Sequence, residues 1–210
     1  MKNVLRLLLL FSCQTIFAQR LELALHGGSG AAAYHNFFQL RKTEYRGARA
    51  SPSHYTSVGL RYRLNKHFSV EEELGLAKMG GGRDYMTRES RYWQQQLSLR
   101  FDFLPYQKGR LNTYARAGLY VGKLERQEIK YPSNRYYYEC FGFIELADIK
   151  RRDWGATGAL GAMVLIRSPL SMSIELRAVR GFKNLSIYEG SENLYNMAVW
   201  GLVGFHVALF

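Results

Sequence analysis

Cysteine, proline and long apolar runs are all scarce in this 210-residue chain, which holds two cysteines and four prolines. No segment beyond residue 20 is apolar for long enough to span a membrane as a helix. The five histidines lack the spacing of metal ligands, and no complete phosphate-binding motif is present. These absences favour a fold held by packing and backbone pairing, and we predict neither a metal nor a cofactor.

Acidic residues are also few, since 17 aspartates and glutamates stand against 29 lysines and arginines, which gives a formal charge of +12. A basic chain can bind nucleic acid, but no basic helical stripe or zinc-ligand spacing accompanies the charge here. We therefore expect no nucleic-acid partner. Anionic lipid headgroups fit the charge better.

The N-terminal residues have the pattern of a secretory signal peptide. Lys2 and Arg6 give a positive start, residues 4–11 form a short apolar core, and Ala18 is a small residue suited to cleavage. Lipoprotein processing at Cys13 is the alternative, and the bulky residue two positions before it disfavours that site.

We therefore predict a cleaved signal peptide over residues 1–19 and a single exported domain over residues 20–210. The domain keeps one cysteine, Cys140, which cannot form an internal disulfide by itself. No histidine lies near it in sequence, so we expect it to pack in a loop rather than to act as a nucleophile.

Eight segments of the domain alternate apolar with polar residues, which is the pattern of strands with one apolar face. Short connections alternate with longer ones, and we expect all four prolines to lie in connections. The pattern predicts an all-β fold, an eight-stranded antiparallel up-and-down transmembrane β-barrel with both termini periplasmic. The segments lie near residues 20–29, 55–64, 68–78, 92–104, 111–122, 154–166, 171–180 and 194–210.

Charged residues gather on the face opposite the apolar rows. Leu97 and Leu99 point one way, for example, while Ser98 and Arg100 point the other. A membrane barrel turns its apolar face to lipid, and eight strands leave an interior that side chains fill. We predict a packed interior charge network of Arg61, Arg63, Glu71, Glu73, Arg100, Asp102, Arg116, Glu175 and Arg177.

Hairpin registers predict which of these charges face each other. The short turn after residue 64 sets Arg61 opposite Glu71. The short turn after residue 166 sets Arg177 opposite Gly161, whose missing side chain would leave room for a guanidinium. The last segment is apolar on both faces, so periodicity does not orient it.

Aromatic residues near the predicted strand ends suggest two girdles at the membrane interfaces. The first would lie toward the long loops and the second toward the short turns. The members are Tyr92, Trp93, Tyr120, Trp154, Tyr195 and Trp200 in the first, and Phe68, Phe101, Phe103 and Phe210 in the second.

Five stretches carry a resemblance to a known group: residues 17–19 at the end of the signal, residues 59–75, residues 117–118, residues 155–161 and the terminal Phe210. With these, the chain resembles the small outer-membrane β-barrel superfamily, particularly the PorT-like, or porin-family, eight-stranded barrels. The resemblance implies a barrel inserted by the barrel-assembly machinery, with Phe210 as the insertion signal. The PorT-like group also includes members that serve a secretion system.

The favoured interpretation is an envelope barrel with a structural or interaction role. Its partners would be outer-membrane lipids, and its loops would contact lipopolysaccharide or a partner protein. Basic residues in the long loops support lipopolysaccharide phosphates as ligands, although a solvated loop of mixed charge explains them equally well. No catalytic residue is assigned.

Three alternatives remain open from the sequence. A narrow pore would need a water path past Arg61 and Glu71. A lipid A-modifying enzyme would need His26 of the His26-Gly-Gly-Ser29 stretch, or a loop histidine, beside a serine and a carboxylate at the outer rim. A soluble exported barrel holding a ligand would need residues 97–103 to turn their apolar face inward.

Overall fold

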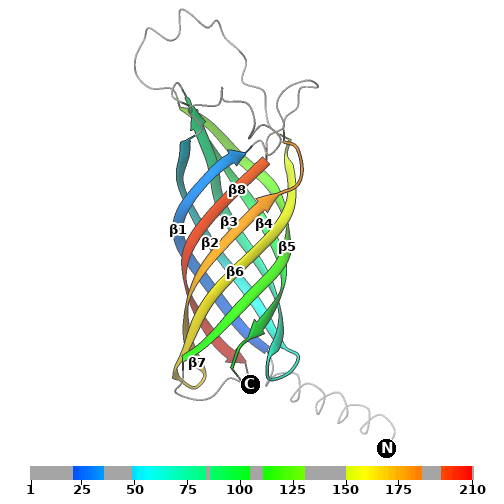
Figure 1. The fold of residues 1–210 in the computed structure, drawn as a ribbon, viewed down its shortest axis with the longest axis vertical. Coiled ribbons are helices and arrows are strands. Elements are labelled where there is room, and N and C mark those ends of the chain that lie inside the picture. Colours follow the sequence, from blue (N-terminus) through cyan, green and yellow to red (C-terminus); the bar gives the residue numbers. More distant parts are fainter. Residues whose placement is uncertain are drawn as a thin grey trace, which may run out of the picture.

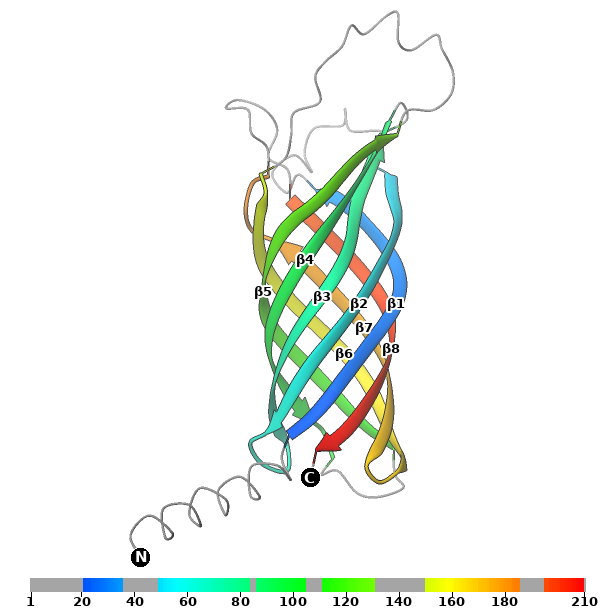
Figure 2. The ribbon, with the colours of Figure 1, turned by 180° about the vertical axis from the view of Figure 1, so that it is seen from behind.

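Eight strands form one closed barrel. The computed structural model describes residues 21–35, 49–83, 86–104, 111–130, 150–185 and 195–209. Each strand pairs antiparallel with its neighbours in the chain, and β8 pairs with β1 to close the sheet (Figures 1 and 2). The predicted all-β up-and-down barrel is confirmed. The strands are β1 (Leu21–His35), β2 (Arg49–Arg63), β3 (Phe68–Arg83), β4 (Met86–Asp102), β5 (Leu111–Lys130), β6 (Arg152–Arg167), β7 (Leu170–Gly181) and β8 (Tyr195–Leu209).

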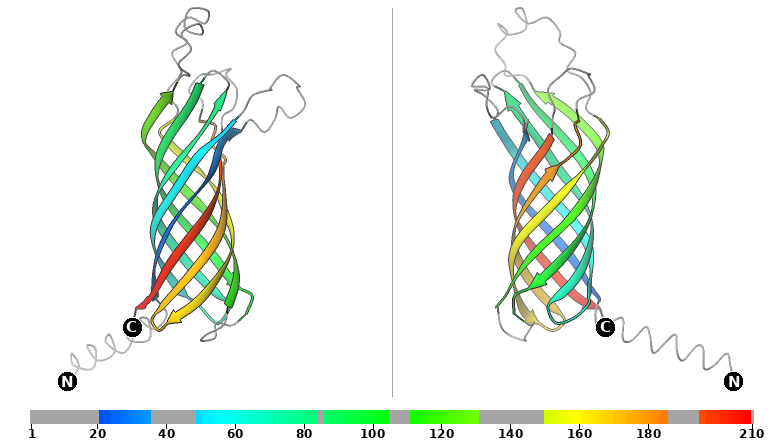
Figure 3. Two further views of the ribbon diagram at one scale, coloured as in Figure 1. Left: turned by 90° about the vertical axis from the view of Figure 1, so that its left-hand side faces the viewer. Right: turned by 45° about the vertical axis from the view of Figure 1, so that its right-hand side comes forward.

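The strands wind around the barrel axis at a steep tilt (Figure 3). Following paired residues once around the barrel from Leu21 leads back to β1 at Ala31, which is ten residues farther along. At about 3.3 Å per residue and about 4.8 Å between strands, this offset over eight strands gives a tilt of about 40°. Because the sheet is closed, both edges of each strand are paired along the body of the barrel. The backbone N–H and C=O groups there have partners, as they must in the hydrocarbon of a bilayer.

The beginning of β1 and the end of β8 lie together, because Leu21 pairs with Leu209. The β2–β3 turn lies at this same end, which we call the short-turn end, and the opposite end is the long-loop end (Figure 3). In that turn Asn65 Oδ1 accepts hydrogen bonds from the backbone N–H groups of His67 at 2.8 Å and Phe68 at 2.9 Å. The turn gives the predicted hairpin register, with residue 61 opposite residue 71.

The predicted register of the β6–β7 hairpin is wrong by two residues. Gly161 pairs with Glu175 and not with Arg177. The turn pairs Arg167 with Leu170 rather than Ser171, which accounts for one residue, and an irregularity between Leu165 and Arg167 adds the second. The space at Gly161 is taken by Tyr114 instead of a guanidinium, since a Cβ built on the glycine would lie 2.4 Å from the tyrosine Cζ.

Several strands extend farther toward the long-loop end than predicted. β2 contains Pro52, so the expectation that every proline lies in a connection is wrong. The proline lies within a register irregularity between Ala50 and His54, where the ladder is already interrupted. The extensions carry polar residues on both faces, and a search for alternation therefore does not find them.

The apolar rows face outward. Leu97, Leu119 and Leu160 are 58%, 62% and 63% exposed, while their neighbours in the chain point into the barrel. The face formed by Leu97, Leu99, Phe101 and Phe103 is among these exposed rows, so the alternative of a soluble barrel with this face inward is wrong. Among the described residues, no helix has the length and apolar character needed to cross a membrane.

The girdle predictions hold for some aromatics and not for others. Trp93 and Trp154 are about half exposed near the long-loop end, and the phenylalanines at positions 68, 101 and 103 are exposed near the short-turn end. Tyr92, Tyr120 and Trp200 are instead fully buried inside the barrel, so their assignment to a girdle is wrong. The strand parity directs them inward. Tyr195 is half-buried at the beginning of β8, and Phe210 lies outside the described residues.

Candidate functional site

Charged side chains fill the half of the lumen nearer the short-turn end. Of the nine charges assigned to the interior from sequence, eight are buried, and Arg63 at the barrel mouth is half-buried. They come from β2, β3, β4, β5 and β7, because each strand turns one side chain in two toward the lumen. Glu22 of β1 joins them.

Glu73 is the centre of this cluster. It accepts two hydrogen bonds from Arg177, at 2.7 Å and 3.1 Å, and another from Arg116. Tyr55 and Ser57 of β2 donate their hydroxyls to the same carboxylate at 3.1 Å and 2.9 Å. Five hydrogen bonds therefore hold one carboxylate that is 1% exposed.

Arg116 connects three carboxylates from two strands. Besides Glu73, its guanidinium lies 3.2 Å from Glu71 Oε1 and 2.8 Å from Glu175 Oε1. Arg177 also donates from Nε to Glu175 Oε1 at 2.7 Å. We call these five residues the central network.

A second group of charges lies closer to the short-turn end. Arg61 and Arg63 both pair with Glu22, the latter at 2.5 Å. Arg100 pairs with Asp102 at 2.7 Å. Arg61 lies opposite Glu71 on the backbone ladder, as predicted, but its guanidinium pairs with Glu22 of β1 instead. Long side chains reach across the lumen rather than along the ladder.

The charges in the half of the lumen nearer the short-turn end balance. Five arginines face five carboxylates, so the network is neutral when the two buried histidines are neutral. Balance matters because an unpaired charge in such a site is costly. The charges are Arg61, Arg63, Arg100, Arg116 and Arg177 against Glu22, Glu71, Glu73, Asp102 and Glu175.

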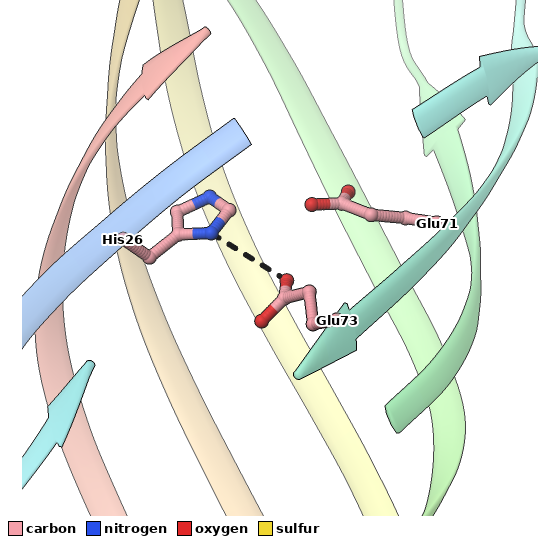
Figure 4. A group of neighbouring side chains, drawn as sticks. All are labelled: His26, Glu71 and Glu73. Atoms are coloured by element: carbon pink, nitrogen blue, oxygen red, sulfur yellow. Dashed lines mark ion pairs between the residues drawn. The ribbon is translucent and has the colours of Figure 1, made fainter. Parts of the chain in front are cut away.

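One group in the lumen has the residue types of a metal site. His26, Glu71 and Glu73 bring one ligand atom each to within 4.8 Å of one another, and all three side chains point into the lumen (Figure 4). His26 Nδ1 lies 3.6 Å from Glu73 Oε1. Both carboxylates are already in contact with Arg116, so a metal ion would have to displace a guanidinium.

An aromatic layer lies in the lumen on the long-loop side of the central network. Tyr55 stacks on Trp200 with ring centroids 5.0 Å apart, and the guanidinium of Arg177 lies 4.8 Å from the Tyr55 ring centroid. Trp200 donates from Nε1 to Ser53 Oγ at 2.6 Å. Tyr92 packs in the same buried cluster. Sequence periodicity missed Trp200 because β8 could not be oriented, whereas the parity of β2 and β4 already directs Tyr55 and Tyr92 inward.

The residues considered for lipid A chemistry are not assembled as that alternative requires. His26 faces the lumen while Ser29 faces outward, so they lie on opposite sides of the sheet. Ser29 Oγ instead meets the cross-strand His54 Nδ1 at 3.1 Å on the exterior. Within the described strands no carboxylate contacts His54. His67 lies at the short-turn end, where its Nδ1 is 2.9 Å from the backbone oxygen of Asp102.

Basic side chains gather on the exterior at the long-loop end. Lys78 is opposite Arg91, and Lys123 is opposite Arg152; we call these four residues the basic rim. The rim lies just beyond Trp93, the cross-strand partner of Lys123. Like charges directly opposite each other destabilise a sheet, and only Lys78 of the four has a described acidic partner, at 3.0 Å.

Solved structures share this fold. The outer membrane protein OprG from Pseudomonas aeruginosa aligns with a TM-score of 0.51 at 12% sequence identity, covering 89% of this chain and 95% of that chain. Neisserial surface protein A aligns with a TM-score of 0.50 at 9% identity, covering 89% and 97%. No family model matches the sequence, and no curated protein is significantly similar to it. The chain therefore has the fold of the small outer-membrane β-barrels, as its resemblance implied, while the narrower PorT-like resemblance stays a prediction.

Proposed function

We propose that this protein is an integral outer-membrane barrel with a sealed lumen and a structural or interaction role, and that its basic rim binds the phosphate groups of lipopolysaccharide. The proposal rests on three features of the barrel: an apolar exterior, a charge-balanced interior, and a rim in which basic side chains lie opposite each other on paired strands. The exterior serves insertion, the interior keeps the lumen closed, and the rim serves recognition.

The membrane assignment is supported by the exposed apolar rows between Trp93 and Trp154 at one end and Phe101 at the other. A soluble protein rarely leaves so large an apolar surface uncovered. Envelope fractionation tests the assignment. We expect the chain in the outer-membrane fraction, in a band whose gel mobility changes on boiling; a soluble periplasmic band would contradict it.

The role as a sealed barrel rather than a pore is supported by the stacked Tyr55–Trp200 pair over the central network. An ion would have to separate both the rings and the guanidinium–carboxylate pairs. We expect the purified protein in planar lipid bilayers to give no stable conductance steps at moderate voltage. Reproducible steps would favour the pore alternative.

The basic rim is supported as a phosphate site by its two like-charged cross-strand pairs, which an anion between them would stabilise. Replacing all four rim residues with glutamine should weaken lipopolysaccharide binding by about tenfold or more. The matched control replaces Lys66 and Arg167, exposed basic residues at the short-turn end, and should leave the affinity unchanged. The rim variant and the unaltered protein should bind dephosphorylated lipid A with the same affinity. Equal lipopolysaccharide affinities for the rim and control variants would contradict this assignment.

Assembly is a separate element of the proposal. The barrel-assembly machinery would recognise the C-terminal strand through Phe210. Deleting Phe210 should lower the yield of folded barrel in the outer membrane, and a normal yield would remove the terminal residue from the proposal. The signal peptide over residues 1–19 stays a prediction, and it lies outside the described residues.

A further inference from the structure

An acidic side chain interrupts the apolar exterior in the middle of the barrel wall. Glu72 points outward from β3, four residues from Phe68 at one end and six residues from Lys78 of the basic rim at the other. Gln95 of β4 also points outward, and its Nε2 donates a hydrogen bond to Glu72 Oε1 at 2.7 Å. Both side chains are exposed. Whereas the carboxylates of the central network meet guanidinium groups, this carboxyl meets an amide.

The pair is surrounded by leucines. Leu60 and Leu97 are the cross-strand partners of Glu72, and Leu74 is the partner of Gln95; they are 47%, 58% and 53% exposed. Lipid chains offer neither donors nor acceptors, so polar groups placed among them lose hydrogen bonds. A polar pair inside an apolar ring has the layout of a packed interface core, in which a second surface supplies the missing partners.

We propose that this patch, formed by Glu72 and Gln95 with Leu60, Leu74 and Leu97, is the site at which a second copy of the chain packs within the membrane. A two-fold axis parallel to the barrel axis sets β3 of one copy against β4 of the other. Because such an axis preserves depth in the membrane, it brings the carboxyl of each copy to the amide of the other.

In this arrangement the hydrogen-bond donors of one copy match the acceptors of the other. Gln95 has two amide hydrogens and uses one on its own Glu72, which leaves the second for the carboxyl of the other copy. Each Glu72 carboxyl has two oxygens, so it can accept one hydrogen bond from its own Gln95 and another from the Gln95 of the other copy. The four groups then close a ring of hydrogen bonds.

Self-complementarity selects a second copy over other occupants. One patch holds one carboxyl and one amide, and its two-fold image presents the same groups in the complementary order. A membrane-spanning helix or an unrelated barrel would need its own polar pair at this depth. The inference rests on the proposed membrane placement, because the same exterior in water would be solvated.

Cysteine cross-linking in isolated outer membranes tests the interface. Leu97→Cys is placed in a background in which Cys13 and Cys140 are serines. The membranes are then treated with a short cross-linker that reacts with one thiol at each end. The matched control is Leu176→Cys on β7, which is 60% exposed and lies three strands from β4 in one direction and four strands from β3 in the other. We expect a cross-linked dimer from Leu97→Cys and none from Leu176→Cys.

Side-chain replacements then test the polar ring. Glu72→Leu combined with Gln95→Leu should lower the cross-linked fraction by about tenfold. Both leucines suit a lipid-facing position, so the variant should keep its heat-dependent gel mobility. Glu72→Gln keeps an oxygen acceptor at this position, and we expect it to retain the dimer.

Three outcomes would overturn the inference: no dimer above the Leu176→Cys level, a dimer that survives the double leucine variant, or a cross-link to a different protein. Each is read in a band whose mobility changes on boiling, so the barrel itself is intact. Loss of that band, or a soluble chain, would instead contradict the proposed membrane function.

Discussion

Replacing Arg177 with methionine tests whether the lumen is held by balanced charges. The Arg177 side chain is 0% exposed and donates to Glu73 at 2.7 Å and 3.1 Å and to Glu175 at 2.7 Å. Methionine fills most of the same volume and has no donor, so Arg177→Met leaves both carboxylates with Arg116 as their only guanidinium partner. Removing one partner of a buried pair costs about 3–5 kcal/mol. We expect the free energy of unfolding to fall by that amount.

An exposed ion pair supplies the matched control. Arg126 lies 2.8 Å from Glu128 on the extension of β5, but these side chains are 68% and 42% exposed. Water screens such a pair, so Arg126→Met should cost less than about 1 kcal/mol. The two substitutions are chemically identical, and the difference between their costs isolates the effect of burial.

A double-mutant cycle with Glu73→Gln separates the pair from its surroundings. Because Arg177 and Glu73 share two hydrogen bonds, the combined loss should be smaller than the sum of the single losses by about 1–3 kcal/mol. Reversible urea unfolding in lipid vesicles, followed by tryptophan fluorescence, gives each free energy. Additive losses, or an Arg177→Met cost no larger than that of Arg126→Met, would refute the reasoning.

Three further substitutions probe the wall and the lumen by the same unfolding assay. Leu99→Arg puts a charge on the apolar exterior and should cost about 2–4 kcal/mol; an unchanged stability would reverse the assignment of inside and outside. Gly161→Ala should cost about 1–3 kcal/mol because its Cβ would lie 2.4 Å from the Tyr114 ring, whereas Gly158→Ala, whose nearest neighbouring atom is 3.9 Å away, should be nearly neutral; equal costs would contradict the packing. Trp200→Ala should cost about 3–5 kcal/mol by removing the ring stacked on Tyr55, and a loss under about 1 kcal/mol would show that the aromatic layer is not packed.

Strand existence and the side that each residue faces were predictable from sequence where alternation is regular. Leu99 and Arg100 point in opposite directions because successive strand residues always do, whatever the rest of the chain does. The β2–β3 register was equally accessible, since the turn at Asn65 is short and local. β8 was not orientable, because apolar residues such as Trp200 occupy its inner face as well as its outer one.

Which side chains meet was decided by the tertiary structure. Parity placed Arg177 and Glu73 in the lumen, but they are 104 residues apart and come from strands that do not pair with each other. Their contact depends on barrel closure and on the ten-residue offset that sets the level of each strand. Direction is a local property of an extended backbone, whereas the partner of a lumen charge depends on every register around the barrel.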